Sequence, residues 1–485
     1  MKVRKKSLCR TCRKRKIRCD GEQPACSQCL KSGRSCSYPD ALFVQGHSIP
    51  GSRQAKPQPA LERVPDNLVP QANPSSLTSV SSRETNISGA TPIYPCLTDP
   101  WEKTISLIIR NYVPYREVSA DITDIVPQSP RICGSWVTAL PELAAGSSGK
   151  LGECLTSAMN ALAFSITSYM TGEQLTRPIS LSYGHALQLL QDNLRSTGGS
   201  YKAEQTAAVM CIALLEVSTP TSPNSWLVHI HGLGELIRLS SPDSFSTGVQ
   251  HTLFIGIRPL LIIEAFVSRK ATFLAEEEWA TGPFQHHQPS PLQSLFTIAA
   301  SIPPVLEKID VLKEEPTEAA ANAAKTYLTH LMKIKMRFES WASSFQTDSP
   351  RPLCWQKTEV AADGGHDEFL SFPSLSIANA FTHLWSFQIT CMLHIRDLLL
   401  RFPELSGFKI ILSIDEIRTS CHELSVKILQ SMKFLMRQEF MLYGRFSAGF
   451  PLSTAYKSLS FDAEGRNVLH EYEQTVPRHI SQKYM

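Results

Sequence analysis

The 485-residue chain lacks long apolar runs. The longest, such as Ala207 to Leu215 and Leu260 to Ile263, fall well short of the roughly 20 residues that a membrane-spanning helix needs. The chain also has no readable signal peptide, because its basic start is followed by more charge instead of an apolar stretch. We therefore expect an intracellular protein that has no membrane partner and no structural disulfides.

Sequence motifs typical of common enzymes are missing as well. The chain contains no Gly-x-Ser-x-Gly elbow, no phosphate-binding Gly-x4-Gly-Lys loop and no His-Glu-x2-His helix. Two histidines, His229 and His231, lie two residues apart, a spacing that points side chains to different sides of a helix. We therefore expect neither catalysis nor a metal site from them, although an enzyme in the C-terminal part stays an open alternative.

Charge is distributed unevenly along the chain. Residues 1–40 carry 12 Lys and Arg against 3 Asp and Glu, a net charge of +9, while the remaining residues carry 36 against 41, a net charge of −5. Such an asymmetry predicts a polyanionic partner for the basic end. We call residues 1–40 the head.

Composition divides the rest of the chain into two further parts. Residues 41–100 are rich in Pro, Ser, Gln, Asn and Thr and show little helical periodicity, so we predict a disordered linker. Residues 101–485, the body, show apolar residues at helical spacing and little strand-like alternation, which indicates an all-α domain. The clearest expected helices are Ala203 to Glu216, Trp226 to Leu239, Arg258 to Phe273, Ala319 to Ser340, Ile377 to Phe402 and Ile414 to Met436.

Six of the 13 cysteines lie in the head, in a Cys-x2-Cys-x6-Cys unit that occurs twice: Cys9, Cys12, Cys19, Cys26, Cys29 and Cys36. Two residues between cysteines let a tight turn direct both sulfurs at one metal ion, and six more allow a short helix and a return strand to bring in a third sulfur. No histidine precedes His47, which excludes a Cys2His2 finger and favours thiolate ligands for zinc. The seven scattered cysteines are expected to be buried thiols.

Six thiolates cannot fill two separate tetrahedral sites, because two metal ions need eight bonds. Two sulfurs must therefore bridge, and Cys9 and Cys26 are the natural bridges because each opens one of the two units. A head of this size cannot bury enough apolar surface to fold alone. We expect the two Zn²⁺ ions to supply most of its folding energy, on the order of 10 kcal/mol for each structural zinc.

Across residues 9–36 the sequence resembles the fungal Zn2Cys6 binuclear zinc cluster transcription factors. The likeness lies in the string Cys9-Arg-Thr-Cys-Arg-Lys-Arg-Lys-Ile-Arg-Cys-Asp20 and in Pro24, which precedes Cys26 by two residues. The resemblance implies a nuclear protein that binds a CGG-type triplet in the major groove of double-stranded DNA. It makes Lys16 the first choice for contacting base edges, and Arg15 the second.

Elementary chemistry supports a DNA-binding surface of this kind. Lys and Arg donate to guanine O6 and N7, and other cations neutralise phosphates, a role that suits Arg13, Lys14, Arg18 and Lys31. Two alternatives stay open. Lys16 could touch phosphate alone, and the cysteine cluster could be a zinc clip for protein interaction without sequence-specific DNA binding.

The body resembles, more weakly, the fungal-specific transcription factor domain that often follows such clusters. The likeness lies in Trp226 to Ile237 and in Arg258 to Phe266, which continues through Arg269-Lys270 to Glu276-Glu-Glu-Trp279. The resemblance implies a regulatory region that contacts coactivators or the transcription machinery and controls a metabolic or secondary-metabolite gene set. Proline-rich sequence after the head leaves no heptad pattern there, so any homodimer would form through the body.

Overall fold

The computed structural model describes residues 10–15, 17, 19–20, 26–32, 34, 100–114, 132–196, 200–312, 317–347, 352–360, 366–407 and 413–475. The chain divides into two units, Met1–Thr91 and Pro92–Met485. The first contains the head, and the second contains the body. Nearly all of the expected linker, residues 41–100, lies outside the described residues.

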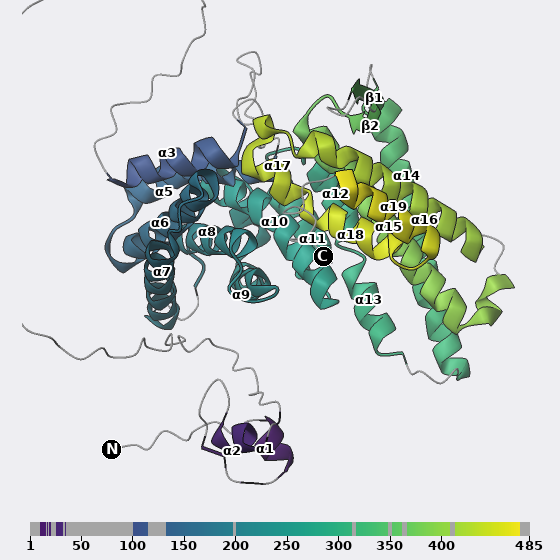
Figure 1. The fold of residues 1–485 in the computed structure, drawn as a ribbon, viewed down its shortest axis with the longest axis horizontal. Helices are drawn as coiled ribbons and strands as arrows, with labels where there is room; N and C mark the ends of the chain where they lie inside the picture. The colour runs from purple at the N-terminus through teal and green to yellow at the C-terminus, as the bar shows by residue number, and fades with distance from the viewer. Residues whose placement is uncertain are drawn as a thin grey trace, which may run out of the picture. The chain divides into compact units, whose positions relative to one another are not determined.

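The described part of the head contains two five-residue helices, α1 (Arg10–Lys14) and α2 (Ser27–Lys31), drawn in purple in Figure 1. Cys26 caps α2, because its Sγ accepts a hydrogen bond from the Cys29 backbone N–H at 3.4 Å. Cys19, which we expected on a return strand, lies in backbone outside any helix or strand.

The body is built almost entirely from helices that pack around one continuous apolar core. Its first part is formed by α3 (Pro100–Tyr112), η1 (Cys133–Ala139), α5 (Leu140–Gly146), α6 (Gly149–Thr171), α7 (Thr176–Ser196), α8 (Ala203–Ser218) and α9 (Ser225–Arg238). Helix α6 packs on α3, α7 and α8, and α9 packs on α8 (Figure 1). Gly172 ends α6 in the left-handed conformation, at φ 73°, where glycine is the favoured residue.

The middle of the body consists of short elements around one long helix. They are η2 (Pro242–Phe245), α10 (Gly248–Ser268), η3 (Phe273–Ala275), α11 (Glu277–Thr281), η4 (Gly282–Phe284), α12 (Pro291–Ala299) and α13 (Pro303–Asp310). Helix α10 contacts α8, α9 and η1 of the first part, and it also contacts α12. Helix α12 packs on α14 and α15, so the middle elements join the first part of the body to the last. By length and composition α10 could cross a membrane, but 67% of its apolar window is buried within the body, as in a core helix.

The last part of the body contains the longest helices. They are α14 (Glu318–Thr347), α15 (Leu375–Arg401), η5 (Pro403–Gly407), α16 (Ile414–Leu435), η6 (Gln438–Phe440), α17 (Met441–Ser447), α18 (Gly449–Leu459) and α19 (Ala463–Thr475). Helix α15 packs between α14, α16 and α18. A capping box begins α16, in which Ser413 and Glu416 each accept a hydrogen bond from the other's backbone N–H.

A two-stranded antiparallel hairpin, β1 (Trp355–Val360) and β2 (His366–Ser371), is the part of the body that departs from the all-α expectation. Trp355 pairs with Ser371, and Lys357 pairs with Phe369. The hairpin packs on α16, where Phe369 is buried beneath the Lys433 ammonium, 4.8 Å from the ring centroid. Sequence alone does not predict this hairpin, because the four residues from Gln356 to Glu359 are all polar and show no strand-like alternation.

The expected helix Arg258 to Phe273 is wrong at both ends, because α10 begins ten residues earlier and ends at Ser268. Pro259 lies inside this helix and has no N–H to donate to the carbonyl of Ile255, four residues before it. The Gln293 side chain of α12 supplies the missing donor, with its Nε2 2.9 Å from the Ile255 oxygen. The helix therefore continues through a proline that from sequence alone looks like a helix start.

Candidate metal centre and nucleic-acid interface

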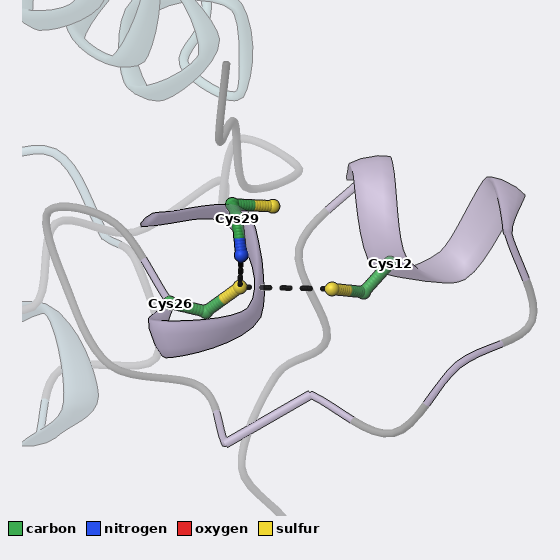
Figure 2. Close-up of side chains that lie close together, drawn as sticks. All are labelled: Cys12, Cys26 and Cys29. Carbon is green, nitrogen blue, oxygen red and sulfur yellow. Dashed lines mark hydrogen bonds between the residues drawn. The ribbon is translucent and has the colours of Figure 1, made fainter. Parts of the chain in front are cut away.

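Four of the six predicted metal-ligating cysteines lie in the described part of the head. Cys12 comes from α1, Cys29 from α2, Cys26 from the position that caps α2, and Cys19 from the irregular backbone between the helices. Figure 2 shows the Cys12 sulfur opposite the Cys26 sulfur, with Cys29 in the same turn as Cys26. Cys9 and Cys36 lie outside the described residues.

The sulfur atoms are separated as ligands of one metal ion would be. The Sγ atoms of Cys12 and Cys26 are 3.6 Å apart, much farther than the roughly 2.05 Å of a disulfide bond. Four sulfurs placed tetrahedrally at about 2.3 Å from a zinc ion are about 3.8 Å from one another. The Sγ atoms of Cys12, Cys26 and Cys29 all lie within 4.8 Å of one another, so this group has the spacing of a thiolate metal site.

Cys26 belongs to two such groups. Its sulfur also lies within 4.8 Å of the Cys19 sulfur and of an Asp20 carboxylate oxygen. A sulfur that reaches both groups has the position that a bridging ligand requires. Of the two predicted bridges, Cys26 therefore has suitable geometry, and the role of Cys9 stays a prediction because Cys9 is not described.

The interior of the described head consists of cysteine side chains. Cys12 and Cys26 are completely buried, Cys29 is 2% exposed, and the partly buried Cys19 packs against them. The larger apolar residues point outward instead, with Ile17 37% exposed and Leu30 67% exposed. Without an apolar core, the described head has little to hold its two helices together except ligation by the sulfurs.

Three of the six predicted DNA-contacting residues have described side chains, and all three are exposed: Lys14, Arg15 and Lys31. Lys14 and Arg15 lie at the C-terminal end of α1, and Lys31 ends α2. None of these three side chains forms an ion pair within the described part of the chain, so their charge is available to a polyanion. Arg13 lies in α1, but its side chain is not described, and Lys16 and Arg18 lie outside the described residues.

A polar contact that was not predicted from the sequence lies beside the sulfurs. One Asp20 carboxylate oxygen, Oδ2, accepts a hydrogen bond from the Ser27 backbone N–H at 3.1 Å and another from the Ser27 hydroxyl. In the sequence, Asp20 is one of the three acids of the head and the last residue of the string that resembles the family. The available signal was its position directly after Cys19, which mirrors the position of Ser27 directly after Cys26.

His229 and His231 have different partners, and the described thiols of the body are buried or half-buried. His229 Nε2 lies 3.3 Å from the Tyr183 hydroxyl, whereas His231 Nδ1 lies 3.5 Å from a Glu264 oxygen, so the two rings serve different partners as expected. Five body cysteines are buried and Cys354 is half-buried. Burial raises the pKa of the Cys133 thiol to about 12, which keeps this thiol protonated. Cys96 lies outside the described residues.

Comparison with known proteins identifies the head. Residues 8–42 match the fungal Zn(2)-Cys(6) binuclear cluster domain. The chain is 29% identical over 150 residues to an uncharacterized protein of Emericella nidulans, a match that covers 31% of each chain. It is 33% identical over 89 residues to the sorbicillinoid biosynthetic cluster transcription factor of Hypocrea jecorina, covering 18% of this chain and 11% of the relative.

The match to a third relative is about as long as the head. A transcription factor of Fusarium proliferatum is 49% identical over 40 residues, which are 8% of this chain and 16% of that protein. The chain thus spans less than a third of the length of each of these relatives. No solved structure is significantly similar to the chain. Residues 8–42 accordingly form a fungal Zn(2)-Cys(6) binuclear cluster domain, which holds two zinc ions through cysteine thiolates.

Proposed function

We propose that this protein regulates RNA polymerase II transcription by binding specific DNA sequences through its binuclear zinc head. One observation carries the proposal: the described head has cysteine sulfurs for its interior and unpaired basic side chains at the end of α1. A metal-organised fold with an exposed cationic helix end suits recognition of a polyanion. The match to the binuclear cluster domain and two relatives named as transcription factors support the same function.

In this proposal all six head cysteines hold the two zinc ions, and Cys9 and Cys26 bridge them. The Cys26 sulfur lies within 4.8 Å of the ligand atoms of both groups, which supports a bridging role for Cys26. The two halves of the head then differ in charge. Helix α1 is followed by a basic run that ends at Arg18, whereas α2 is followed by Ser32, Gly33 and a single cation, Arg34. The first half therefore faces the DNA.

Contacts with DNA are assigned by the chemistry of each side chain. Lys16 and then Arg15 donate to guanine in a CGG-type triplet and so specify sequence. Arg13, Lys14, Arg18 and Lys31 neutralise phosphates and supply affinity that depends on salt. The exposure of Lys14, Arg15 and Lys31 supports their share of this assignment.

The body completes the regulator in this proposal. It acts as an all-α fungal transcription factor regulatory domain, it contacts coactivators or the transcription machinery, and it forms any homodimer. A metabolic or secondary-metabolite gene set is the proposed target, which the name of the Hypocrea jecorina relative supports. The place of action is the nucleus.

The test uses the purified full chain and labelled DNA duplexes. Wild-type protein should hold two zinc ions and bind a duplex containing CGG more tightly than a shuffled duplex, and a zinc chelator should abolish binding to both. Lys16→Ala should reduce the preference for CGG by about 1–3 kcal/mol, the usual value of one good base contact. Fluorescence anisotropy over a salt series measures affinity and salt dependence together.

Lys31→Ala serves as the matched control. Loss of one phosphate contact should weaken binding to both duplexes equally and reduce the slope of log affinity against log salt by about 1. A wild-type chain that holds zinc but binds every duplex equally weakly would contradict the proposal and favour a zinc clip for protein interaction. A preference for CGG that survives Lys16→Ala would remove Lys16 from its assigned role.

A further inference from the structure

Two hydrogen bonds connect the first half of the head to the second. Asp20 follows Cys19, the last described cysteine of the first half, and Ser27 follows Cys26, which opens the second half. Asp20 Oδ2 accepts from the Ser27 backbone N–H and from the Ser27 hydroxyl. Both donors thus meet on one oxygen, which fixes the position of the Ser27 residue relative to the first half.

Fixing Ser27 also fixes the sulfur beside it. Ser27 is the first residue of α2, and the peptide bond that carries its N–H joins it directly to Cys26. The Cys26 sulfur is held from the other side by the Cys29 N–H at 3.4 Å. Asp20 and Cys29 therefore restrain Cys26 from opposite ends of one turn. The Cys26 sulfur is the one that lies in both groups of ligand atoms.

The two nearest sulfurs, once deprotonated, oppose a carboxylate at this place. An Asp20 oxygen lies within 4.8 Å of the sulfurs of Cys19 and Cys26, and like charges repel at such a distance. Two donors of Ser27, at the start of α2, stabilise the carboxylate. This contact therefore serves to hold the metal ligands in position. Removing hydrogen bonds that orient metal ligands commonly lowers metal affinity about 10- to 100-fold.

We infer that Asp20 is a positioning residue for the bridging thiolate of Cys26, acting through Ser27 to hold the two halves of the zinc cluster in register. The inference rests on the proposed function, because it requires a bridged two-metal cluster. It also assigns a role to an acidic residue within a strongly basic head. Asn at this position should be tolerated, because one amide oxygen can accept both hydrogen bonds from Ser27.

The experiment loads the full chain with zinc, or with cobalt as a spectroscopic probe. Asp20→Ala should speed the loss of metal to a chelator by roughly 10- to 100-fold and should change the thiolate-to-cobalt charge-transfer band. Asp20→Asn should remain close to wild type in both measurements. Ser27→Ala, which removes the hydroxyl and keeps the N–H, should give an intermediate rate.

Two further variants sharpen the test. Ser27→Asp places a second carboxylate against Asp20 and should release metal fastest. Gln28→Ala changes an exposed side chain on the same helix turn and should behave as wild type. If Asp20→Ala does not fold at all, the graded series of Ser27→Ala and Ser27→Asp still supports or contradicts the inference.

Two kinds of failure are distinguishable. If wild-type protein holds two metal ions and prefers CGG, but Asp20→Ala keeps the wild-type band and release rate, this inference fails and the proposed function stands. If wild-type protein holds fewer than two metal ions, the bridged cluster itself is absent and the proposed function fails with it.

Discussion

Gln293 lies where two groups of helix α10 need a hydrogen-bond partner. Its Nε2 donates to the Ile255 carbonyl that Pro259 cannot reach, and its Oε1 accepts from the Arg258 guanidinium at 2.9 Å. Arg258 is completely buried, and it also donates to the Gln293 backbone oxygen and to Thr297. Burial lowers the pKa of Arg258 to about 10, so this side chain stays charged at neutral pH.

Gln293→Leu should therefore destabilise the body by about 2–5 kcal/mol, because it leaves a buried carbonyl and part of a buried cation without partners. The midpoint of thermal unfolding, followed by circular dichroism at 222 nm, measures the loss. Gln188→Leu, at an exposed position of α7, is the control and should change the midpoint little. Equal midpoints for the two variants would contradict the role assigned to Gln293.

A buried histidine couples the stability of the body to pH. His383 lies in α15 between the rings of Phe296 and Phe450, and its Nδ1 lies 2.8 Å from the Asn379 backbone oxygen. Burial lowers the pKa of His383 to about 4, whereas an unfolded histidine has a pKa of about 6.5. The unfolded chain therefore binds more protons than the folded chain between these two pH values.

The free energy of unfolding should consequently fall as pH falls from about 6.5 to about 4, with a contribution from His383 of at most about 1.4 kcal/mol per pH unit. His383→Phe should flatten the dependence on pH in this window. Denaturant unfolding at a series of pH values measures it. His330→Phe, at an exposed position of α14, should leave the slope as it is in wild type, and an unchanged slope in His383→Phe would refute the prediction.

Glycines in helices show where two elements come closest. A Cβ atom on Gly256 of α10 would lie 2.7 Å from Cβ and Cδ1 of Trp136 in η1, a distance that real contacts do not tolerate. A Cβ atom on Gly232 of α9 would meet nothing within 4 Å. The first glycine is therefore needed for packing between η1 and α10, and the second is not.

Alanine at these two positions should have opposite effects. Gly256→Ala should destabilise the body by about 1–3 kcal/mol, because the Trp136 ring has to move. Gly232→Ala should stabilise α9 by up to about 1 kcal/mol, because alanine favours helix. Chemical denaturation of both variants checks this prediction, and a gain of stability in Gly256→Ala would show that α10 and η1 can separate without cost.

Helical elements of the body were largely predictable from the apolar spacing. The expected helices Ala203 to Glu216 and Ile414 to Met436 agree within two residues with α8 and α16. The errors arise where a distant residue decides the local structure, since Gln293 lies far along the chain from the proline that it compensates. In the head, cysteine spacing predicted the cluster of sulfurs. The matching positions of Asp20 after Cys19 and Ser27 after Cys26 were visible in the sequence, but they did not predict a hydrogen bond between the two residues.

The two units of the chain depend on different sources of stability. The body has a continuous apolar core, whereas the described head is organised by sulfurs. Among the residues that the structure describes, the groups of side chains spaced for a metal ion all lie in the head. Metal removal should therefore affect the head and spare the body.

A strong zinc chelator should abolish DNA binding while the body keeps its helices and its midpoint of thermal unfolding. Circular dichroism at 222 nm, before and after chelation, should change only slightly, because the described head contributes two five-residue helices. Re-addition of zinc should restore DNA binding. A parallel drop in the unfolding midpoint of the body would mean that metal stabilises the whole chain.

Because the interior of the described head consists of cysteine side chains, we expect the head to be unfolded without metal. A newly synthesised chain can complete its helical body from its own side chains, but its DNA-reading end takes shape only when two ions have been delivered. Under the proposed function, the supply of zinc in the cell should therefore limit how many molecules can bind DNA.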